Sequence, residues 1–385
     1  MDWSAFRKLN LSAVRTPIHI IDEGALRRNM EILSRVQRES GAKIIHALKA
    51  FAQHSVFPVM REYLPGATAS SLHEARLARE EFGGEVHVCA PAYVAEEFSD
   101  LLELADHLVF NSASQWETFR ERTLASKQTI ECGLRINPQH SEVKTRLYDP
   151  CAPGSRLGVT AEHMTEKLMR GLSGIHFHTL CEMGLEPLVR TLEVVEKKFN
   201  KWFDRIQWIN FGGGHHITRP DYDTDGLIEL IRAFRQKYGL TVYMEPGEAS
   251  VIRTGVLVAR VLDVIPGSPP IAMLDVSATA HMPDTLEMPY RPDILDASEP
   301  EERSYTYALG GPTCLAGDAI GHYSFDNRLE VGSLLFFLDM SHYTMVKNTQ
   351  FNGVRLPSIA IADTKTGRLE VVREFGYEDF RARLS

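Results

Sequence analysis

The stretch QWINFGGGHH, residues 207–216, runs from an apolar segment directly into three glycines. Residues 207–211 have the length and apolar character of a buried strand. The glycines let the chain turn tightly and bring backbone N–H groups close to an anion. Phosphate sites of parallel α/β barrels are built in this way, at the carboxyl ends of strands. A triple glycine is also compatible with a plain tight turn, so this stretch favours a phosphate site without deciding it.

Short apolar runs alternate with amphipathic stretches on both sides of this segment. The expected strands are residues 17–21, 43–48, 67–69, 86–89, 107–110, 132–136, 174–178, 207–211 and 241–244. Helical spacing of apolar residues lies between them, as in residues 187–203 and 224–238. Such alternation predicts parallel βα units, and the closed form of that pattern is a (β/α)8 barrel of about 250 residues.

The pattern changes after residue 247. Residues 256–264, 271–274, 304–309, 333–338 and 358–362 read as strands separated by Gly/Pro turns, with few helices between them. We therefore expect an α/β barrel at 23–250 and a mostly-β domain at 251–385. Residues 1–22 form an N-terminal segment that we expect to pack on the β domain.

Composition limits the possible functions. The 385 residues include 42 Lys+Arg and 51 Asp+Glu, a net charge of -9, which disfavours nucleic acid and suits a cationic ligand. No window approaches the roughly 18 consecutive apolar residues of a membrane helix, and the N-terminus lacks a signal-peptide pattern. The five cysteines include no CxxC pair, which argues against a disulfide framework and a thiolate zinc site. A cytoplasmic location is expected.

Two strand ends carry residues with chemical potential. Lys49 follows the apolar strand ending at Leu48; inside a barrel its pKa would fall and favour Schiff-base formation, whereas at a surface it would be an ordinary lysine. His176 and His178 alternate, so they share one face of a strand. The pair could bind a metal. Alternatively, one histidine packs in the interior and the other faces solvent, or one ring lies flat on an aromatic cofactor.

Two turns carry further candidates. Glu245 comes directly after a strand, where its carboxylate would reach the barrel mouth, and a turn of the β domain contains Cys314 and Asp318. A turn with a thiol and a carboxylate is unremarkable alone. No nucleophile elbow, Walker loop or zincin helix is present.

Six segments together resemble the fold-type III pyridoxal-phosphate (PLP) enzymes, which include ornithine and diaminopimelate decarboxylases and alanine racemase. They are residues 47–51, 174–182, 212–214, 245–248, 310–314 and 341–344. The resemblance runs from about Thr16 to the C-terminus. Within this group, the carboxynorspermidine/carboxyspermidine decarboxylases have the most similar motifs to HFHTLCE, FGGGHHIT, MEPGEA and GPTCLAGD. The resemblance implies a PLP-binding barrel, a C-terminal β-barrel domain, a homodimer with shared active sites and a carboxylated polyamine as substrate.

The resemblance also implies roles for individual residues. Lys49 would hold PLP as a Schiff base, His178 would stack on the pyridine ring, and Glu245 would pair with the ring nitrogen. The phosphate would be bound by Gly212, Gly213, Gly214 and the hydroxyl of Tyr343. No bound metal is implied.

The proton donor in this scheme is Cys314, supplied by the other subunit. The chain departs from the ornithine-type pattern at two phosphate positions. Leu180 and Cys181 stand where those relatives carry a serine, and Glu248 stands where they carry an arginine. Glu248 is therefore available for another task.

Carboxylates at the expected site indicate both the type of reaction and the type of substrate. Glu245 would keep the pyridine nitrogen protonated, which suits decarboxylation, whereas racemases of this fold place an arginine there. The ammonium groups of a polyamine need acceptors when they leave water. We predict that Glu248 and Asp284 hold them, with Asp318 as a third; the alternative is that all three are solvated loop carboxylates.

Three other functions remain open at this stage. One is another PLP reaction, racemisation or elimination, with zinc held by His176 and Cys181. The second is a PLP carrier without catalysis, which the β-rich second half disfavours. The third is a metal-dependent barrel hydrolase that uses His176 and His178. The choice between the norspermidine and spermidine skeletons is not set by the sequence.

Overall fold

The computed structural model describes residues 2–385 and divides into two units. Residues 27–250 form one unit, and residues 2–26 form the other together with residues 251–385. The sequence analysis expected the barrel to begin at residue 23 and to end at residue 250. Within residues 2–385 no helix is long and apolar enough to cross a membrane.

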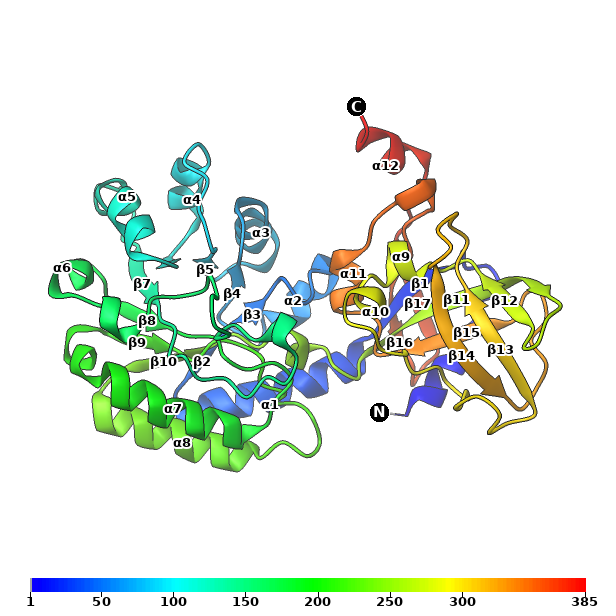
Figure 1. Ribbon diagram of the computed structural model, residues 1–385, viewed down its shortest axis with the longest axis horizontal. Helices are drawn as coiled ribbons and strands as arrows, with labels where there is room; N and C mark the ends of the chain where they lie inside the picture. Colours follow the sequence, from blue (N-terminus) through cyan, green and yellow to red (C-terminus); the bar gives the residue numbers. More distant parts are fainter. Residues whose placement is uncertain (1) are drawn as a thin grey trace. The chain divides into compact units, whose positions relative to one another are not determined.

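The first unit is a parallel β-barrel surrounded by helices (Figure 1). Its strands follow the order β2-β10-β9-β8-β7-β6-β5-β4-β3. They are β2 (Lys43–Ile44), β3 (His46–Ala47), β4 (Gly66–Ala69), β5 (Glu85–Cys89), β6 (His107–Phe110), β7 (Glu131–Arg135), β8 (Gly174–His176), β9 (Trp208–Asn210) and β10 (Thr241–Met244). Only Ile45 separates β2 from β3, and its N–H donates to the carbonyl of Met244, so the sheet closes on itself. The predicted barrel is confirmed.

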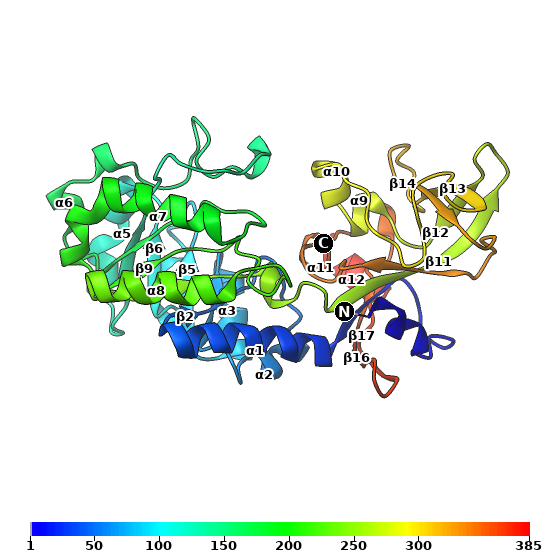
Figure 2. The same cartoon turned by 90° about the horizontal axis from the view of Figure 1, so that it is seen from below.

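The helices cover the outside of the barrel, because each crossover between parallel strands returns along that face (Figure 2). They are α1 (Glu23–Ser40), α2 (Phe57–Met60), α3 (Leu72–Leu77), α4 (Phe98–Leu104), α5 (Ala113–Leu124), α6 (Glu166–Met169), α7 (Leu185–Phe199) and α8 (Thr224–Tyr238). Short turns of 3-10 or π helix complete the unit: η2 (His54–Val56), η3 (Ala78–Phe82), η4 (Arg146–Tyr148), η5 (Ala161–His163), η6 (Asn200–Arg205) and η7 (Glu248–Ser250).

Aromatic rings fill part of the barrel interior. The imidazoles of His87 and His107 stack with centroids 3.8 Å apart. The indole of Trp208 lies against Gly133 and Gly174, where an added Cβ would come within 2.3 and 2.0 Å of the ring. These two strand glycines therefore make room for a large side chain. The filled interior leaves the loops at the strand ends to form a site.

The second unit is a mostly antiparallel sheet with the order β14-β13-β12-β11-β1-β16-β17, and β15 also pairs with β11. Its strands are β1 (Ile18–Asp22), β11 (Gly255–Ile265), β12 (Ile271–Leu274), β13 (Tyr305–Gly310), β14 (Ala319–Phe325), β15 (Leu334–Leu338), β16 (Ser358–Asp363) and β17 (Arg368–Arg373). The short helices are α9 (Ala278–His281), α10 (Asp284–Glu287), α11 (Tyr343–Lys347), α12 (Tyr377–Ala382), η1 (Trp3–Lys8) and η8 (Phe351–Gly353). The expected strand at 17–21 is β1, which pairs with β11 and β16 in this sheet.

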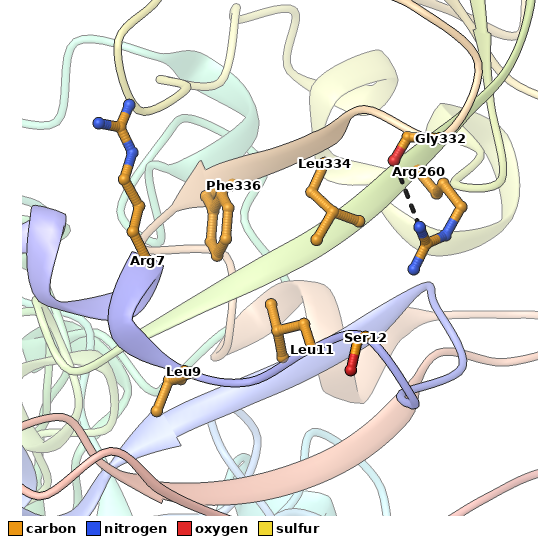
Figure 3. Close-up of a pocket in the computed structure, with 8 residues that line it drawn as sticks. All are labelled: Arg7, Leu9, Leu11, Ser12, Arg260, Gly332, Leu334 and Phe336. Carbon is orange, nitrogen blue, oxygen red and sulfur yellow. Dashed lines mark hydrogen bonds between the residues drawn. The ribbon is translucent and has the colours of Figure 1, made fainter.

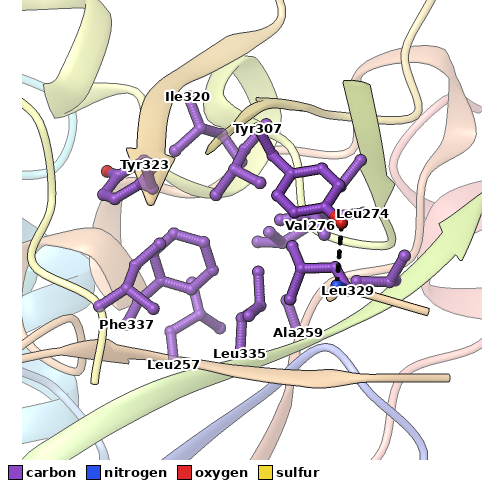
Figure 4. Packing of buried hydrophobic residues seen from close by; sticks show 14 of the residues in the cluster. Leu257, Ala259, Leu274, Val276, Tyr307, Ile320, Tyr323, Leu329, Leu335 and Phe337 are labelled. Carbon is purple, nitrogen blue, oxygen red and sulfur yellow. Dashed lines mark hydrogen bonds between the residues drawn. The ribbon is translucent and has the colours of Figure 1, made fainter. Parts of the chain in front are cut away.

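The first half of β11, residues 255–259, is buried on both faces because it separates two apolar clusters. Leu257 and Ala259 point into the larger cluster (Figure 4). Val256 and Val258 alternate with them and point into the smaller cluster, which the N-terminal segment covers. In that cluster a small pocket separates Leu9 and Leu11 from Leu334 and Phe336 (Figure 3).

Candidate active site

Lys49 lies two residues beyond β3, at the carboxyl end of the barrel strands. Its neighbours Leu48 and Ala50 are buried, whereas its own side chain keeps solvent-exposed surface. Desolvation is the main cause that lowers the pKa of Lys49, and the positive charge of Arg135 lowers it further. A lowered pKa raises the fraction of neutral amine, which is the nucleophilic form of lysine.

Glu245 is a buried carboxylate at the end of β10. Its Oε1 accepts a hydrogen bond from Asn210 Nδ2 at 2.8 Å, and its Oε2 lies 3.2 Å from His176 Nε2. Burial alone would raise the pKa of Glu245, but its contacts with His176 and Asn210 and the nearby His87 lower it below its usual value. Burial lowers the pKa of His176, so we assign a neutral imidazole that donates Nε2–H to an ionised Glu245.

His178 is fixed against the glycine loop that follows β9. Its Nδ1 accepts a hydrogen bond from the N–H of Gly213 at 2.9 Å. Burial, and then the charges of Lys49 and Arg135, hold the pKa of His178 well below its usual value, so the ring is neutral. Both histidines of the HxH pair therefore serve this end of the barrel, His176 toward Glu245 and His178 toward the loop.

The three glycines of the loop are required by close contacts. An added Cβ on Gly213 would come within 2.4 Å of the Glu245 carbonyl oxygen. Gly212 and Gly214 have φ of +70° and +82°, and their added Cβ atoms would meet backbone oxygens at 2.3 and 2.0 Å. Such a loop keeps the backbone near the reacting groups. Its N–H groups at Gly212 and Gly213 already donate to Asn210 and His178.

Three residues near Lys49 were missed by the sequence analysis. Arg135 is buried at the end of β7, and Cys89, at the end of β5, has its pKa raised to about 11 by burial. Glu74 follows β4; burial raises its pKa, and the charge of Lys49 opposes that shift. Arg135 had a visible signal, since it is a charged residue that ends an apolar strand, as Lys49 does.

Glu248 lies in η7, three residues beyond Glu245. Its Oε2 is 3.2 Å from Nε2 of the buried His216. The second histidine of the GGGHH stretch thus supports the carboxylate that replaces the arginine of ornithine-type enzymes.

Burial, followed by the negative charges of Glu182 and Glu248, raises the pKa of the Cys181 thiol to about 11.

The other predicted residues belong to the unit that contains the β sheet. Cys314 is exposed in the turn between β13 and β14. Tyr343 is half-buried and begins α11. Asp284 begins α10 and forms an ion pair with Lys347, which also pairs with Glu287.

Asp318 does not fit the predicted amine-binding role. It is 5% exposed, and its carboxylate accepts hydrogen bonds from Ser277 Oγ, from the N–H of Thr279, and from the N–H and Oγ1 of Thr313. These groups already satisfy both oxygens. The sequence could not reveal this, because Ser277 and Thr279 lie some 40 positions from Asp318 in the chain.

Possible metal ligands are committed to other contacts. Within residues 2–385 one group, Glu85, His87 and His107, brings three donor atoms within 4.8 Å of one another. The Lys43 ammonium and the Tyr243 hydroxyl already bind Glu85. The two imidazole planes differ by only 8°, so their in-plane lone pairs do not converge on one ion.

The family assignment follows from comparison with known proteins. Residues 30–341 match the family model described as "Pyridoxal-dependent decarboxylase, C-terminal sheet domain". The chain belongs to the pyridoxal-dependent decarboxylase family. PLP is therefore its cofactor, and the predicted decarboxylase class and fold-type III architecture are confirmed.

The relatives are similar over nearly their full length. The chain is 43% identical to a carboxynorspermidine/carboxyspermidine decarboxylase of Campylobacter jejuni, over 96% of this chain and 98% of the relative. It is 47% identical to a carboxyaminopropylagmatine decarboxylase of Synechocystis sp., over 97% of this chain and 96% of the relative. The crystal structure of the Campylobacter jejuni carboxynorspermidine decarboxylase complexed with norspermidine superposes with a TM-score of 0.89 at 42% identity, covering 96% of this chain and 100% of that one.

The residues at the carboxyl end of the barrel fit PLP. Lys49 has a lowered pKa, Glu245 is an ionised carboxylate at the same end of the barrel, and the glycine loop provides a close backbone. These are the three groups needed to bond an aldehyde, hold a protonated ring nitrogen and approach a phosphate.

Proposed function

We propose that this decarboxylase acts on a carboxylated polyamine. The observation that carries the proposal is that relatives at 43% and 47% identity over nearly the full chain are named for carboxylated polyamine substrates. Glu248 supports it, because a carboxylate replaces a phosphate-binding cation of ornithine-type enzymes. Carboxynorspermidine and carboxyspermidine are the leading substrates. Carboxyaminopropylagmatine is a second candidate, favoured by the 47% identical relative.

The proposed cofactor site uses barrel residues already described together with Tyr343 of the β-sheet unit. Lys49 holds PLP as a Schiff base, His178 stacks on the ring, and Glu245 keeps a proton on the ring nitrogen. Gly212, Gly213, Gly214 and the Tyr343 hydroxyl bind the phosphate. PLP supplies the electron sink that makes loss of carbon dioxide possible. The ionised state of Glu245 supports this assignment, since a protonated ring nitrogen needs a negative partner.

The proposed substrate site holds ammonium groups with Glu248 and Asp284. Each carboxylate has a cationic or imidazole neighbour, His216 for Glu248 and Lys347 for Asp284. An ammonium group that reaches either carboxylate forms a charge-assisted hydrogen bond of the kind these neighbours make.

The proposed proton donor is Cys314 of the partner subunit in a homodimer. Its turn is exposed from Cys314 through Gly317, and Leu315 is 46% exposed. This exposure leaves the Cys314 thiol accessible to a second subunit. A cytoplasmic location stays a prediction that rests on the five unpaired cysteines.

The test is carbon dioxide release by the PLP-loaded protein. Carboxynorspermidine, carboxyspermidine and carboxyaminopropylagmatine are compared with ornithine, lysine and diaminopimelate. The proposal expects turnover of at least one carboxylated polyamine at a kcat/KM well above that of all three simple amino acids. Preference for diaminopimelate or ornithine would refute it.

A further inference from the structure

The turn that carries Cys314 is held from two sides by polar side chains. We infer that Asp318 and Asn352 are positioning residues that fix the place of the Cys314 thiol. The inference deepens the proposed function and rests on the proposed role of Cys314. It also gives Asp318 a task in place of the amine binding that the sequence suggested.

Asp318 forms the interior of the turn. Its Oδ2 accepts the N–H of Thr313 at 3.1 Å and the hydroxyl of Thr313 at 2.7 Å. The backbone closes around it, because the N–H of Gly311 donates to the Asp318 carbonyl at 2.9 Å. A Cβ on Gly311 would come within 2.4 Å of the same carboxylate. The residue immediately before Cys314 is therefore tied to a buried charge.

Asp318 also joins this turn to a second segment. Ser277 Oγ lies 3.0 and 2.9 Å from the two carboxylate oxygens, and the N–H of Thr279 donates to Oδ1 at 3.2 Å. Ser277 caps α9 by accepting the N–H of Ala280 at 2.9 Å. Because α9 leads into α10, which begins at Asp284, one carboxylate links the proposed proton donor to the segment of a proposed amine ligand.

Asn352 holds the turn from the outside. Its Oδ1 accepts the N–H of Cys314 itself at 2.8 Å. Asn352 is exposed and has φ of +56°, a left-handed conformation that asparagine tolerates better than most residues. The side-chain carbonyl is thereby directed at one backbone group of the proton donor. Loss of that acceptor frees the Cys314 backbone without removing any buried group.

The matched variants are Asn352→Leu, which removes the acceptor, and Asn352→Asp, which keeps it. Asp318→Asn tests the buried side, and Asp326→Asn, at an exposed carboxylate of the same unit, is the control. Hydrogen exchange at the amides of Thr313 and Cys314 and the alkylation rate of Cys314 by iodoacetamide report the position of the turn. The kcat and KM of carbon dioxide release report whether the position of the turn matters for catalysis. They are measured with the carboxylated polyamine that the parent enzyme decarboxylates.

We expect Asn352→Leu and Asp318→Asn to speed exchange and to lower kcat about tenfold with little change in KM. Asn352→Asp should behave as the parent in exchange, and Asp326→Asn should behave as the parent throughout. Unchanged exchange and alkylation in Asn352→Leu overturn the inference, as does a raised KM with unchanged kcat in Asp318→Asn. If Asp318→Asn fails to fold, the comparison of Asn352→Leu with Asn352→Asp tests the inference by itself. Full activity in Cys314→Ala would refute the proposed proton donor, whereas exchange and alkylation would still decide whether Asp318 and Asn352 hold the turn.

Discussion

His176 and Glu245 are joined by a buried hydrogen bond of 3.2 Å between Nε2 and Oε2. His176 ends β8 and Glu245 follows β10, with β9 between the two strands, and Asn210 of β9 donates to the other Glu245 oxygen. Asn210 also accepts the N–H of Gly212 at 2.8 Å. One network therefore sets the charge of Glu245 and the start of the glycine loop.

Removing the donor at His176 should weaken PLP binding. His176→Leu leaves Glu245 buried with one hydrogen bond fewer, so the pKa of Glu245 rises and its partnership with a protonated ring nitrogen weakens. We expect the Kd for PLP to rise about tenfold, the effect of one hydrogen bond to a charged group. His176→Gln, which keeps a donor, should stay closer to the parent. Equal PLP affinities for the parent and His176→Leu, measured by absorbance titration, would show that His176 does not act through Glu245.

Acid should destabilise the fold partly through His46. Burial lowers the pKa of His46 from 6.5 to about 4, so the folded protein keeps it neutral while the unfolded chain protonates it. Between pH 6.5 and 4 the unfolded state binds more protons, and the free energy of unfolding falls as pH falls. His46→Gln should reduce that slope by about one proton. Denaturant titrations across this range test it, with the exposed His163→Gln as control; an unchanged slope in His46→Gln would contradict the assignment.

Neutralising the amine-binding carboxylates should affect the substrate and spare the cofactor. Glu248→Gln and Asp284→Asn should each lower kcat/KM for the carboxylated polyamine about 10- to 100-fold, since each loses a charged hydrogen bond. The PLP absorbance spectrum should stay that of the parent. Glu287→Gln is the matched control, because Glu287 shares Lys347 with Asp284. If both variants decarboxylate the polyamine as fast as the parent, the two residues are surface charges.

Mixed dimers should recover activity lost in each parent variant. Lys49→Ala and Cys314→Ala are each expected to be inactive, by loss of the Schiff base and of the proton donor. In a heterodimer one of the two shared sites keeps both residues, so mixing should restore part of the activity. Subunit exchange is verified with a mass-tagged chain. Demonstrated exchange without recovery would place Cys314 in the site of its own chain.

The sequence proposed site residues where a polar residue ends an apolar run. Lys49, His178 and Glu245 were chosen because such a residue stands out locally. The contacts between strands were not predictable, since the His176–Glu245 bond depends on the strand order β8-β9-β10. Arg135 was overlooked although it also ends an apolar strand.

The carboxylates of the β unit were harder to interpret from the sequence. Asp318 looked like a loop carboxylate, and its burial depends on Ser277 and Thr279, far away in the chain. Asp284 was predicted without its partner Lys347, because α10 and α11 are about sixty residues apart. The sequence shows which residues are charged, whereas the partners of each charged residue depend on how distant segments pack.

Mapping the reduced cofactor onto the chain tests directly whether Lys49 binds PLP. The PLP-loaded protein is treated with borohydride and digested, and the lysine peptides are weighed by mass spectrometry. We expect a phosphopyridoxyl group on the peptide containing Lys49. It should be absent in Lys49→Ala and in Lys49→Arg, because a guanidinium does not form the Schiff base. A label on another lysine, or none on a protein that still releases carbon dioxide, would contradict the assignment of Lys49.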